Sequence, residues 1–109
     1  MAYDEGLTEL IRNDLADVSG IEEKKMFGGL RFMLNGHMLC GVHKGGGMFR
    51  VGKPREATAL AIEGVSVLAF TGRKMGGLVD VTDEAMADDQ RRSALMVLAQ
   101  ENVRSLPPR

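Results

Sequence analysis

A chain of 109 residues with a net charge of −1 is long enough for one hydrophobic core, and we expect residues 1–109 to form a single domain. The single cysteine excludes an internal disulfide, and no apolar run approaches the ~20 residues that a membrane-spanning helix needs. The N-terminus lacks the basic, apolar and small-residue order of a signal peptide. The composition therefore predicts a cytoplasmic globular protein without membrane association.

The first predicted element is an amphipathic helix that Asp4 caps and Ser19-Gly20 ends. Its acidic residues lie on one side, and the early acids suit the positive end of the helix dipole. The apolar residues recur at helical spacing on the other side: Leu7, Leu10, Ile11, Leu15 and Val18. This pattern predicts a helix that packs against the core and carries no site.

Asn35-Gly36 separates two apolar runs and predicts a hairpin between strands at residues 30–34 and 37–42. Both central residues of a type I′ turn need φ > 0, which this dipeptide adopts at least cost. Regular pairing from the turn directs one set of side chains to the core: Leu30, Phe32, Leu34 and Leu39. The opposite face then carries Arg31, Met33, Met38, Cys40 and Val42.

The second face of this hairpin is too apolar for the solvated side of an antiparallel sheet. Either a helix of the same chain or another molecule must therefore cover it. We expect an interface on this face, with a homodimer as the simplest arrangement. The candidate interface residues are Met33, Met38, Cys40 and Val42.

The glycines at 45–47 predict a hairpin loop into a strand at 48–51. A phosphate-binding loop would need a lysine after the glycines and then a helix, whereas Lys44 precedes them. A short helix begins at Lys53-Pro54, because proline suits the first helical turn. A strand at 65–70 follows this helix.

The C-terminal part continues with a turn-rich segment at 71–77 and a strand at 78–81. A long helix should then run from about residue 88 to residue 105. Arg91-Arg92 near its start is unfavourable for the helix dipole. Asp88 and Asp89 can offset this effect through i,i+3 and i,i+4 pairs.

Two glycine-rich motifs frame the predicted sheet: Lys25-Met26-Phe27-Gly28-Gly29 before the hairpin and Gly72-Arg73-Lys74-Met75-Gly76-Gly77 before the last strand. With the hairpin and the last helix, they make the chain resemble the N-terminal domain of the TfoX/Sxy family over essentially its whole length. The resemblance implies an α+β fold of α-β-β-β-α-β-β-α-like order. Such a fold has an antiparallel sheet with its packing helices on one face. It is also similar to the fold of secretion chaperones.

The regulators that name this family activate competence genes together with the cyclic-AMP receptor protein, and they carry a second, C-terminal helical domain. At 109 residues the chain resembles a stand-alone N-terminal domain. The resemblance implies a non-enzymatic protein-interaction domain in transcriptional or competence regulation. Its partner would be a protein such as a transcription regulator.

The charge is unevenly distributed along the chain. Residues 1–23 contain one arginine against seven acidic residues, whereas residues 24–74 contain nine Lys or Arg residues and only two Glu residues. The basic charge thus lies in the predicted sheet, which suggests an anion-binding or nucleic-acid-facing surface. The alternative is charge complementarity within the molecule, because no dense Lys/Arg run is present.

The candidate basic surface comprises the residues beside the two glycine turns, which the family fold would allow to approach each other. These residues are Lys24, Lys25, Arg31, Arg73 and Lys74. Direct nucleic-acid binding through them is one interpretation. The other is that they solvate strand ends and prevent edge-to-edge aggregation.

His37, Cys40 and His43 have residue types that bind zinc, but their spacing on one strand is unsuitable. Cys40 would point away from both histidines, and His37 and His43 would lie ~20 Å apart at the strand rise. Zinc ligands must lie ~2.0–2.3 Å from one ion. No nucleophile has a readable His and acid constellation, so we expect no catalytic, metal or cofactor residues. An enzyme or metal site near the glycine turns is the weaker alternative.

Overall fold

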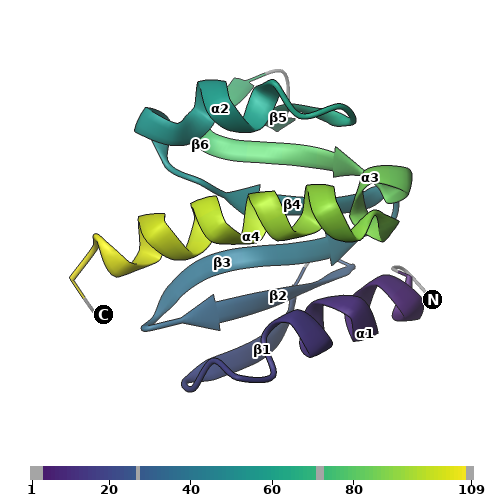
Figure 1. The fold of residues 1–109 in the computed structure, drawn as a ribbon, viewed down its shortest axis with the longest axis vertical. Helices are drawn as coiled ribbons and strands as arrows, with labels where there is room; N and C mark the ends of the chain where they lie inside the picture. Colours follow the sequence, from purple (N-terminus) through teal and green to yellow (C-terminus); the bar gives the residue numbers. More distant parts are fainter. Residues whose placement is uncertain (1–3, 27, 71–72, 108–109) are drawn as a thin grey trace.

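The computed structural model describes residues 4–26, 28–70 and 73–107, and Figure 1 shows their arrangement. One antiparallel sheet contains β1 (Ile21–Met26), β2 (Gly29–Leu34), β3 (His37–His43), β4 (Gly46–Arg50), β5 (Val65–Phe70) and β6 (Arg73–Thr82). The helices are α1 (Glu5–Asp14), the single 3-10 turn η1 (Lys53–Arg55), α2 (Glu56–Leu60), α3 (Asp83–Ala87) and α4 (Asp89–Arg104). The α+β class is confirmed, with β4 and the short α3 added to the order that the family resemblance implied.

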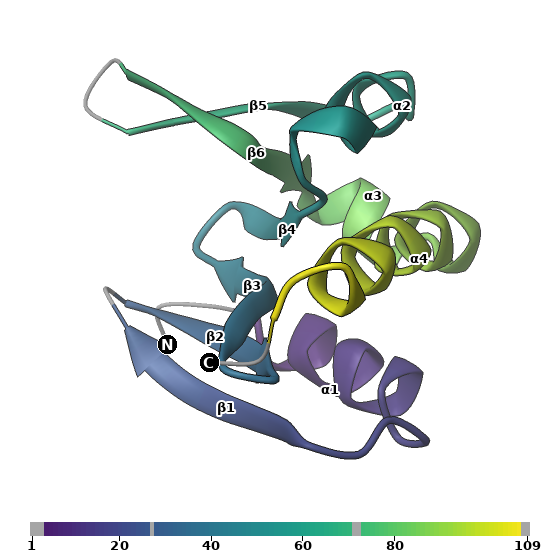
Figure 2. The same cartoon turned by 90° about the vertical axis from the view of Figure 1, so that its left-hand side faces the viewer.

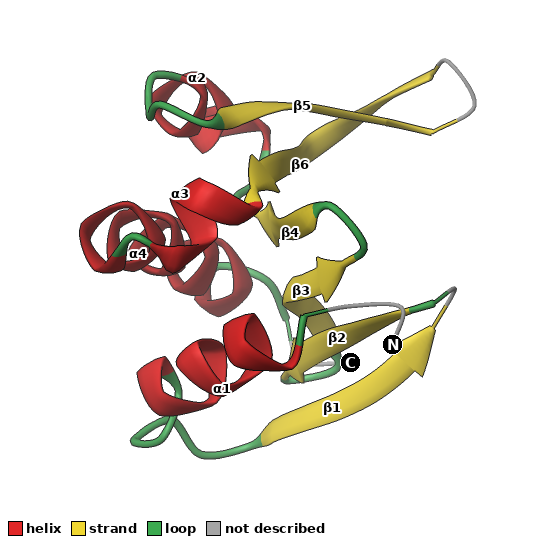
Figure 3. Ribbon diagram, turned by 90° about the vertical axis from the view of Figure 1, so that its right-hand side faces the viewer, coloured by secondary structure: helices red, strands yellow, loops and turns green. Residues whose placement is uncertain are grey.

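The order of strands across the sheet is β1-β2-β3-β4-β6-β5. The first four strands form a meander of successive neighbours, whereas β6 lies between β4 and β5. Figures 2 and 3 show α1, α3 and α4 along one face of the sheet, with α2 on the same side at the β5 edge. Among the described residues, no helix covers the other face.

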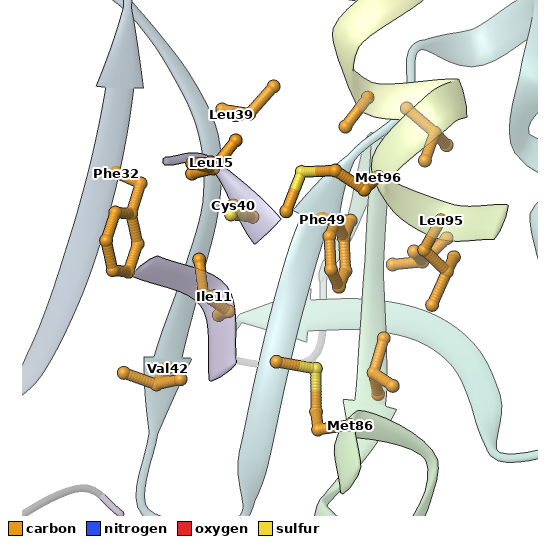
Figure 4. Packing of buried hydrophobic residues seen from close by; sticks show 14 of the residues in the cluster. Ile11, Leu15, Phe32, Leu39, Cys40, Val42, Phe49, Met86, Leu95 and Met96 are labelled. Atoms are coloured by element: carbon orange, nitrogen blue, oxygen red, sulfur yellow. The ribbon is translucent and has the colours of Figure 1, made fainter. Parts of the chain in front are cut away.

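The hydrophobic core lies between the sheet and the helices on its covered face. One cluster joins buried side chains from α1, α3, α4 and the sheet, and Figure 4 shows part of it. Burial of a large apolar side chain stabilises the fold by about 1.5–3 kcal/mol. The largest fully buried side chains are Phe32, Phe49, Ile11, Leu39, Met86 and Leu95.

The turn between β2 and β3 has the predicted backbone conformation, with φ of 55° at Asn35 and 82° at Gly36. The pairing beyond the turn differs from the regular register. A β-bulge shifts it between Phe32 and Met33, so that Phe32 pairs with Cys40. Because a bulge adds one residue to one strand, the side chains beyond it change faces.

The predicted interface is therefore wrong for Cys40 and Val42. Both side chains are fully buried and belong to the core cluster, on the face that the helices cover. Met33 and Met38 lie opposite each other, on the turn side of the bulge. Met38 is buried, yet it is not a member of the core cluster.

The predicted cap of the first helix is present, and this helix is shorter than expected. Asp4, Thr82 and Asp88 accept hydrogen bonds from the first backbone N–H groups of α1, α3 and α4. α1 ends at Asp14 rather than at Ser19-Gly20, although Leu15 beyond its end is still buried in the core. No helix within the described ranges is long and apolar enough to cross a membrane.

Arg92 connects the last helix to the first one. Its side chain is 4% exposed and donates hydrogen bonds to Asp14 Oδ2 at 2.5 Å and to the Met86 carbonyl oxygen at 2.9 Å. A third contact, at 2.7 Å, is the predicted i,i+3 pair with Asp89. The hydrogen bond with Asp14 raises the pKa of Arg92, so the guanidinium remains charged in its buried position.

Candidate functional site

The face of the sheet opposite the helices carries methionines and arginines together, and we call it the outer face. Phe49 pairs with Val79 in the core, so the residues beside them on β4 and β6 point to the other side. The same alternation applies to β1, β2 and β3. The outer face includes Glu22 and Lys24 of β1, Arg31 and Met33 of β2, Met38, Gly41 and His43 of β3, Met48 and Arg50 of β4, and Leu78 and Asp80 of β6.

The apolar side chains of the outer face do not belong to the core cluster. They are Met33, Met38, Met48 and Leu78. Met48 lies in register with Gly41 on one side and with Asp80 on the other, so it occupies the middle of the sheet. The Nη1 group of Arg31 lies 3.5 Å from Met38 Sδ, within hydrogen-bonding distance for sulfur. The flexible Met38 thioether thus lies beside a guanidinium group.

Two hairpins extend on the side of the outer face. Figures 2 and 3 show the β1–β2 hairpin at one edge of the sheet and the β5–β6 hairpin at the other, and both run away from the helices. The outer face lies between these hairpins.

The predicted basic surface is divided by the fold. Lys24 lies opposite Arg31 on β1 and β2, and β3 and β4 separate these strands from β6. Arg73 and Lys74 begin β6, and their side chains lie outside the described part of the structure. Arg31 is in register with Asp80 rather than with the start of β6. The backbone of Arg31 is therefore separated from that of Lys74 by about 14 Å across the sheet and by up to about 20 Å along the strand direction.

The two glycine turns also lie at different ends of the sheet. Gly29 lies close to the Val42 carbonyl, at the end of the sheet where β3 finishes. Gly77 lies close to the backbone of Gly52, beyond the opposite end of β4. Lys25 and Leu30 are paired residues, so Lys25 does not share the outer face with Lys24. The expectation that the two turns approach each other is wrong.

His43 and Asp80 form the closest histidine–carboxylate pair of the sheet, but both ring nitrogens are occupied. Nε2 lies 2.7 Å from Asp80 Oδ1 and 3.1 Å from the Gly47 carbonyl oxygen, so it carries the proton. Nδ1 accepts a hydrogen bond from the Gly45 N–H group at 3.1 Å. The ring therefore fixes the β3–β4 loop, and neither nitrogen remains to accept a proton from a nucleophile.

The three residues with zinc-binding side chains have separate surroundings. His37 Nε2 donates to the Pro107 carbonyl oxygen at 2.6 Å, at the end of the described chain. Cys40 is fully buried in the core, and His43 contacts Asp80. Within the described ranges, no three His, Cys, Asp or Glu residues form a group that could hold a metal ion.

Cys40 should be chemically unreactive in the folded protein. Burial raises the pKa of its thiol, and the Asp14 carboxylate adds to this effect, so the nucleophilic thiolate is not formed near neutral pH. We expect iodoacetamide to label Cys40 only after the protein is unfolded in guanidinium chloride. The exposed Ser93→Cys variant is the positive control, since its added thiol should react in the native protein. Rapid native labelling of Cys40 itself would contradict the buried position.

Sequence reasoning missed half of the outer face. Met48, Arg50, Leu78 and Asp80 were all assigned to strands without an exposed role. Strict alternation around the apolar residues Phe49 and Val51 could have assigned Met48 and Arg50 to one face. The pairing of β4 with β6, which adds Leu78 and Asp80, has no local signal because β5 intervenes in the chain.

Comparison with known proteins agrees with this architecture. The TfoX N-terminal domain matches residues 13–103, which extend from the end of α1 to the last turn of α4. No curated protein and no solved structure matches the chain. Since the matched segment covers most of the 109 residues, including every strand of the sheet, the chain belongs to the TfoX N-terminal domain family.

Proposed function

We propose that this chain is a non-enzymatic protein-interaction domain that binds a protein partner through its outer face. The observation that carries the proposal is the set of apolar side chains outside the core: Met33, Met38, Met48 and Leu78. Met33, Met48 and Leu78 are each partly exposed and Met38 is buried beside them, and apolar side chains gathered on one face of a soluble protein commonly mark a binding site. Arg50 and Asp80 add polar groups to the same face, in register with Leu78 and Met48.

The residue types of the outer face suit a protein partner. Methionine and arginine are enriched at protein interfaces, and methionine adapts its shape to different partners. Arg50 carries a planar guanidinium group of the kind that binds a carboxylate in bidentate fashion. We therefore expect the partner to present apolar side chains flanked by Asp or Glu. The resemblance to competence regulators makes a cytoplasmic transcription regulator the proposed partner class.

The chemistry of the remaining side chains also favours a role without catalysis. The Cys40 thiol is buried in the core, and its pKa is raised by that burial. Both nitrogens of the His43 ring have hydrogen-bond partners in their own loop and in β6. Neither residue has the exposed, activated state that nucleophilic catalysis requires.

The Met33→Lys/Met48→Lys variant tests the proposal. Both side chains are half-buried on the outer face and outside the core, so we expect the fold to persist. Two lysines in the contact area would have to lose their hydration on binding. We expect a protein captured from extract of the source cells by the native chain to be lost with the variant. Its identity comes from mass spectrometry, and its affinity from titration of the purified partner.

Val97→Lys is the matched control, since Val97 is an exposed apolar residue of α4 on the other side of the molecule. Capture of the same partner should be unchanged in this control. Equal capture by the outer-face variant would contradict the proposed site. Tight binding of duplex DNA near physiological salt would instead favour the nucleic-acid alternative. Its affinity would fall with salt at about −0.9 per phosphate contact on logarithmic scales.

A further inference from the structure

The two edge strands of the sheet differ sharply in charge. The edge strand β1 has four consecutive exposed charged residues, at positions 22–25. The edge strand β5 has the sequence Val-Ser-Val-Leu-Ala-Phe and no charged residue. Charges on an edge strand prevent pairing with other chains, whereas a long uncharged edge favours it. The edge of β5 is therefore chemically suited to accept another strand.

The backbone of β5 presents unpaired groups at this edge. The Thr82 N–H group donates to the Gly64 carbonyl at 3.0 Å, and Val65 lies opposite Val81. In an antiparallel ladder this places Val65 and Val67 at positions whose main-chain groups point away from β6. The Val65 N–H group bonds to Ile62 in the preceding loop, at 3.2 Å. Val67 is the last residue before the register shift between Val67 and Ala69, and the alternation up to it directs its N–H and C=O to the open edge.

The side chain of Val67 is also unusually exposed for a large apolar residue. It is 41% exposed, and Val97 is the only other exposed large hydrophobic residue in the described part of the chain. Val67 lies opposite Val79, which is fully buried. The apolar layer of the core thus continues to the β5 edge, where Val67 remains partly exposed.

We propose that β5 pairs with β5 of a second copy of this chain, antiparallel and with Val67 opposite its own copy. In this register the two Val67 residues form a hydrogen-bonded pair, because each directs one backbone donor and one backbone acceptor toward the other. The two-fold symmetry closes the contact, so a dimer forms rather than a filament. Pairing of β5 with β1 of another copy is disfavoured, because it would place an apolar strand beside four charged side chains.

This interaction surface is separate from the outer face, and it does not depend on the partner proposed there. A single edge strand gives a small contact area, and contacts of this size are weak. The dimer should therefore dissociate on dilution. Pairing would cover the exposed part of Val67 and join two six-stranded sheets into one continuous sheet.

Sedimentation velocity over a dilution series tests the proposal. The native chain should change from monomer to dimer at micromolar concentrations, and Val67→Lys should remain a monomer at every concentration. A lysine at this exposed position is a substitution that natural edge strands use against pairing. Val97→Lys should dimerise like the native chain. Circular dichroism and a melting curve establish that each variant is folded.

A second measurement does not depend on the variant. Exchange of the Val67 amide hydrogen with solvent should slow as protein concentration rises. Exchange of the Ser93 amide hydrogen on the exposed side of α4 should not change. A native chain that is a monomer throughout the series would overturn the proposal, as would a dimer unaffected by Val67→Lys. Loss of the dimer in Met33→Lys/Met48→Lys with retention in Val67→Lys would assign self-association to the outer face instead.

Discussion

Gly46→Ala should lower the melting temperature of this protein more than alanine at either neighbouring glycine, Gly45 or Gly47. Gly46 has φ of 144°, and an added Cβ would lie 2.2 Å from the Val81 carbonyl oxygen. The neighbouring atoms are also backbone, at the junction of β6 and α3, so no rotamer change can make room. Either β4 must move away from β6 or the strand must end earlier.

The expected loss for Gly46→Ala is about 3 kcal/mol or more, from overpacking together with a strained backbone. For a chain of this size, that corresponds to a fall of roughly 12 °C or more in melting temperature. Gly45→Ala is the matched control, because its nearest contact would be His43 Cε1 at 3.7 Å. The control should change stability by no more than about 0.5 kcal/mol. Equal melting temperatures for the two variants would mean that β4 and β6 are not as close as described.

Arg92→Met should be the most destabilising replacement of a charged residue. It leaves the Asp14 carboxylate without its arginine and the Met86 carbonyl without a donor, while methionine fills most of the volume. Breaking a fully buried ion pair costs about 3–5 kcal/mol. The Asp14 side chain is 26% exposed and can regain water, so we expect about 2–4 kcal/mol by denaturant unfolding.

The neighbouring residue supplies the control for this experiment. Arg91 contacts Asp88 at 3.3 Å and the exposed Glu63 at 3.5 Å, so Arg91→Met should cost less than about 1 kcal/mol. In Arg92→Met/Asp14→Leu, part of the stability should return, because no carboxylate remains without its partner. If the two single arginine variants are equally stable, Arg92 does not connect α4 to α1 in solution.

Local signals in the sequence predicted most of the elements of this fold. Asn35-Gly36 gave the β2–β3 turn because both residues adopt positive φ, and this conformation depends on the dipeptide alone. Asp4 was recognised as the cap of the first helix because its side chain can accept hydrogen bonds from the N–H groups that follow it at once in the chain. Each of these features involves residues within one turn of each other, so no tertiary information was needed.

The candidate site and the Arg92 ion pair were predicted less well, because contacts between separate elements decide both. The bulge between Phe32 and Met33 has no marker such as glycine, yet it moves Cys40 and Val42 from the predicted interface into the core. Arg92 was expected to be offset by its neighbouring acids, whereas its buried contact with Asp14 joins opposite ends of the chain. Sequence spacing on one element cannot reveal either relationship.

The position of β6 between β4 and β5 has a consequence for the order in which the chain folds. The four strands of the meander pair with their sequence neighbours, and such local contacts form quickly. The pairing of β4 with β6 joins segments that α2 and β5 separate, so it must wait for residues 78–82. On the ribosome, the nascent chain therefore exposes β4 as a temporary edge, with Phe49 uncovered on one side. Arrival of the β5–β6 hairpin, as one unit, removes that edge and completes the sheet.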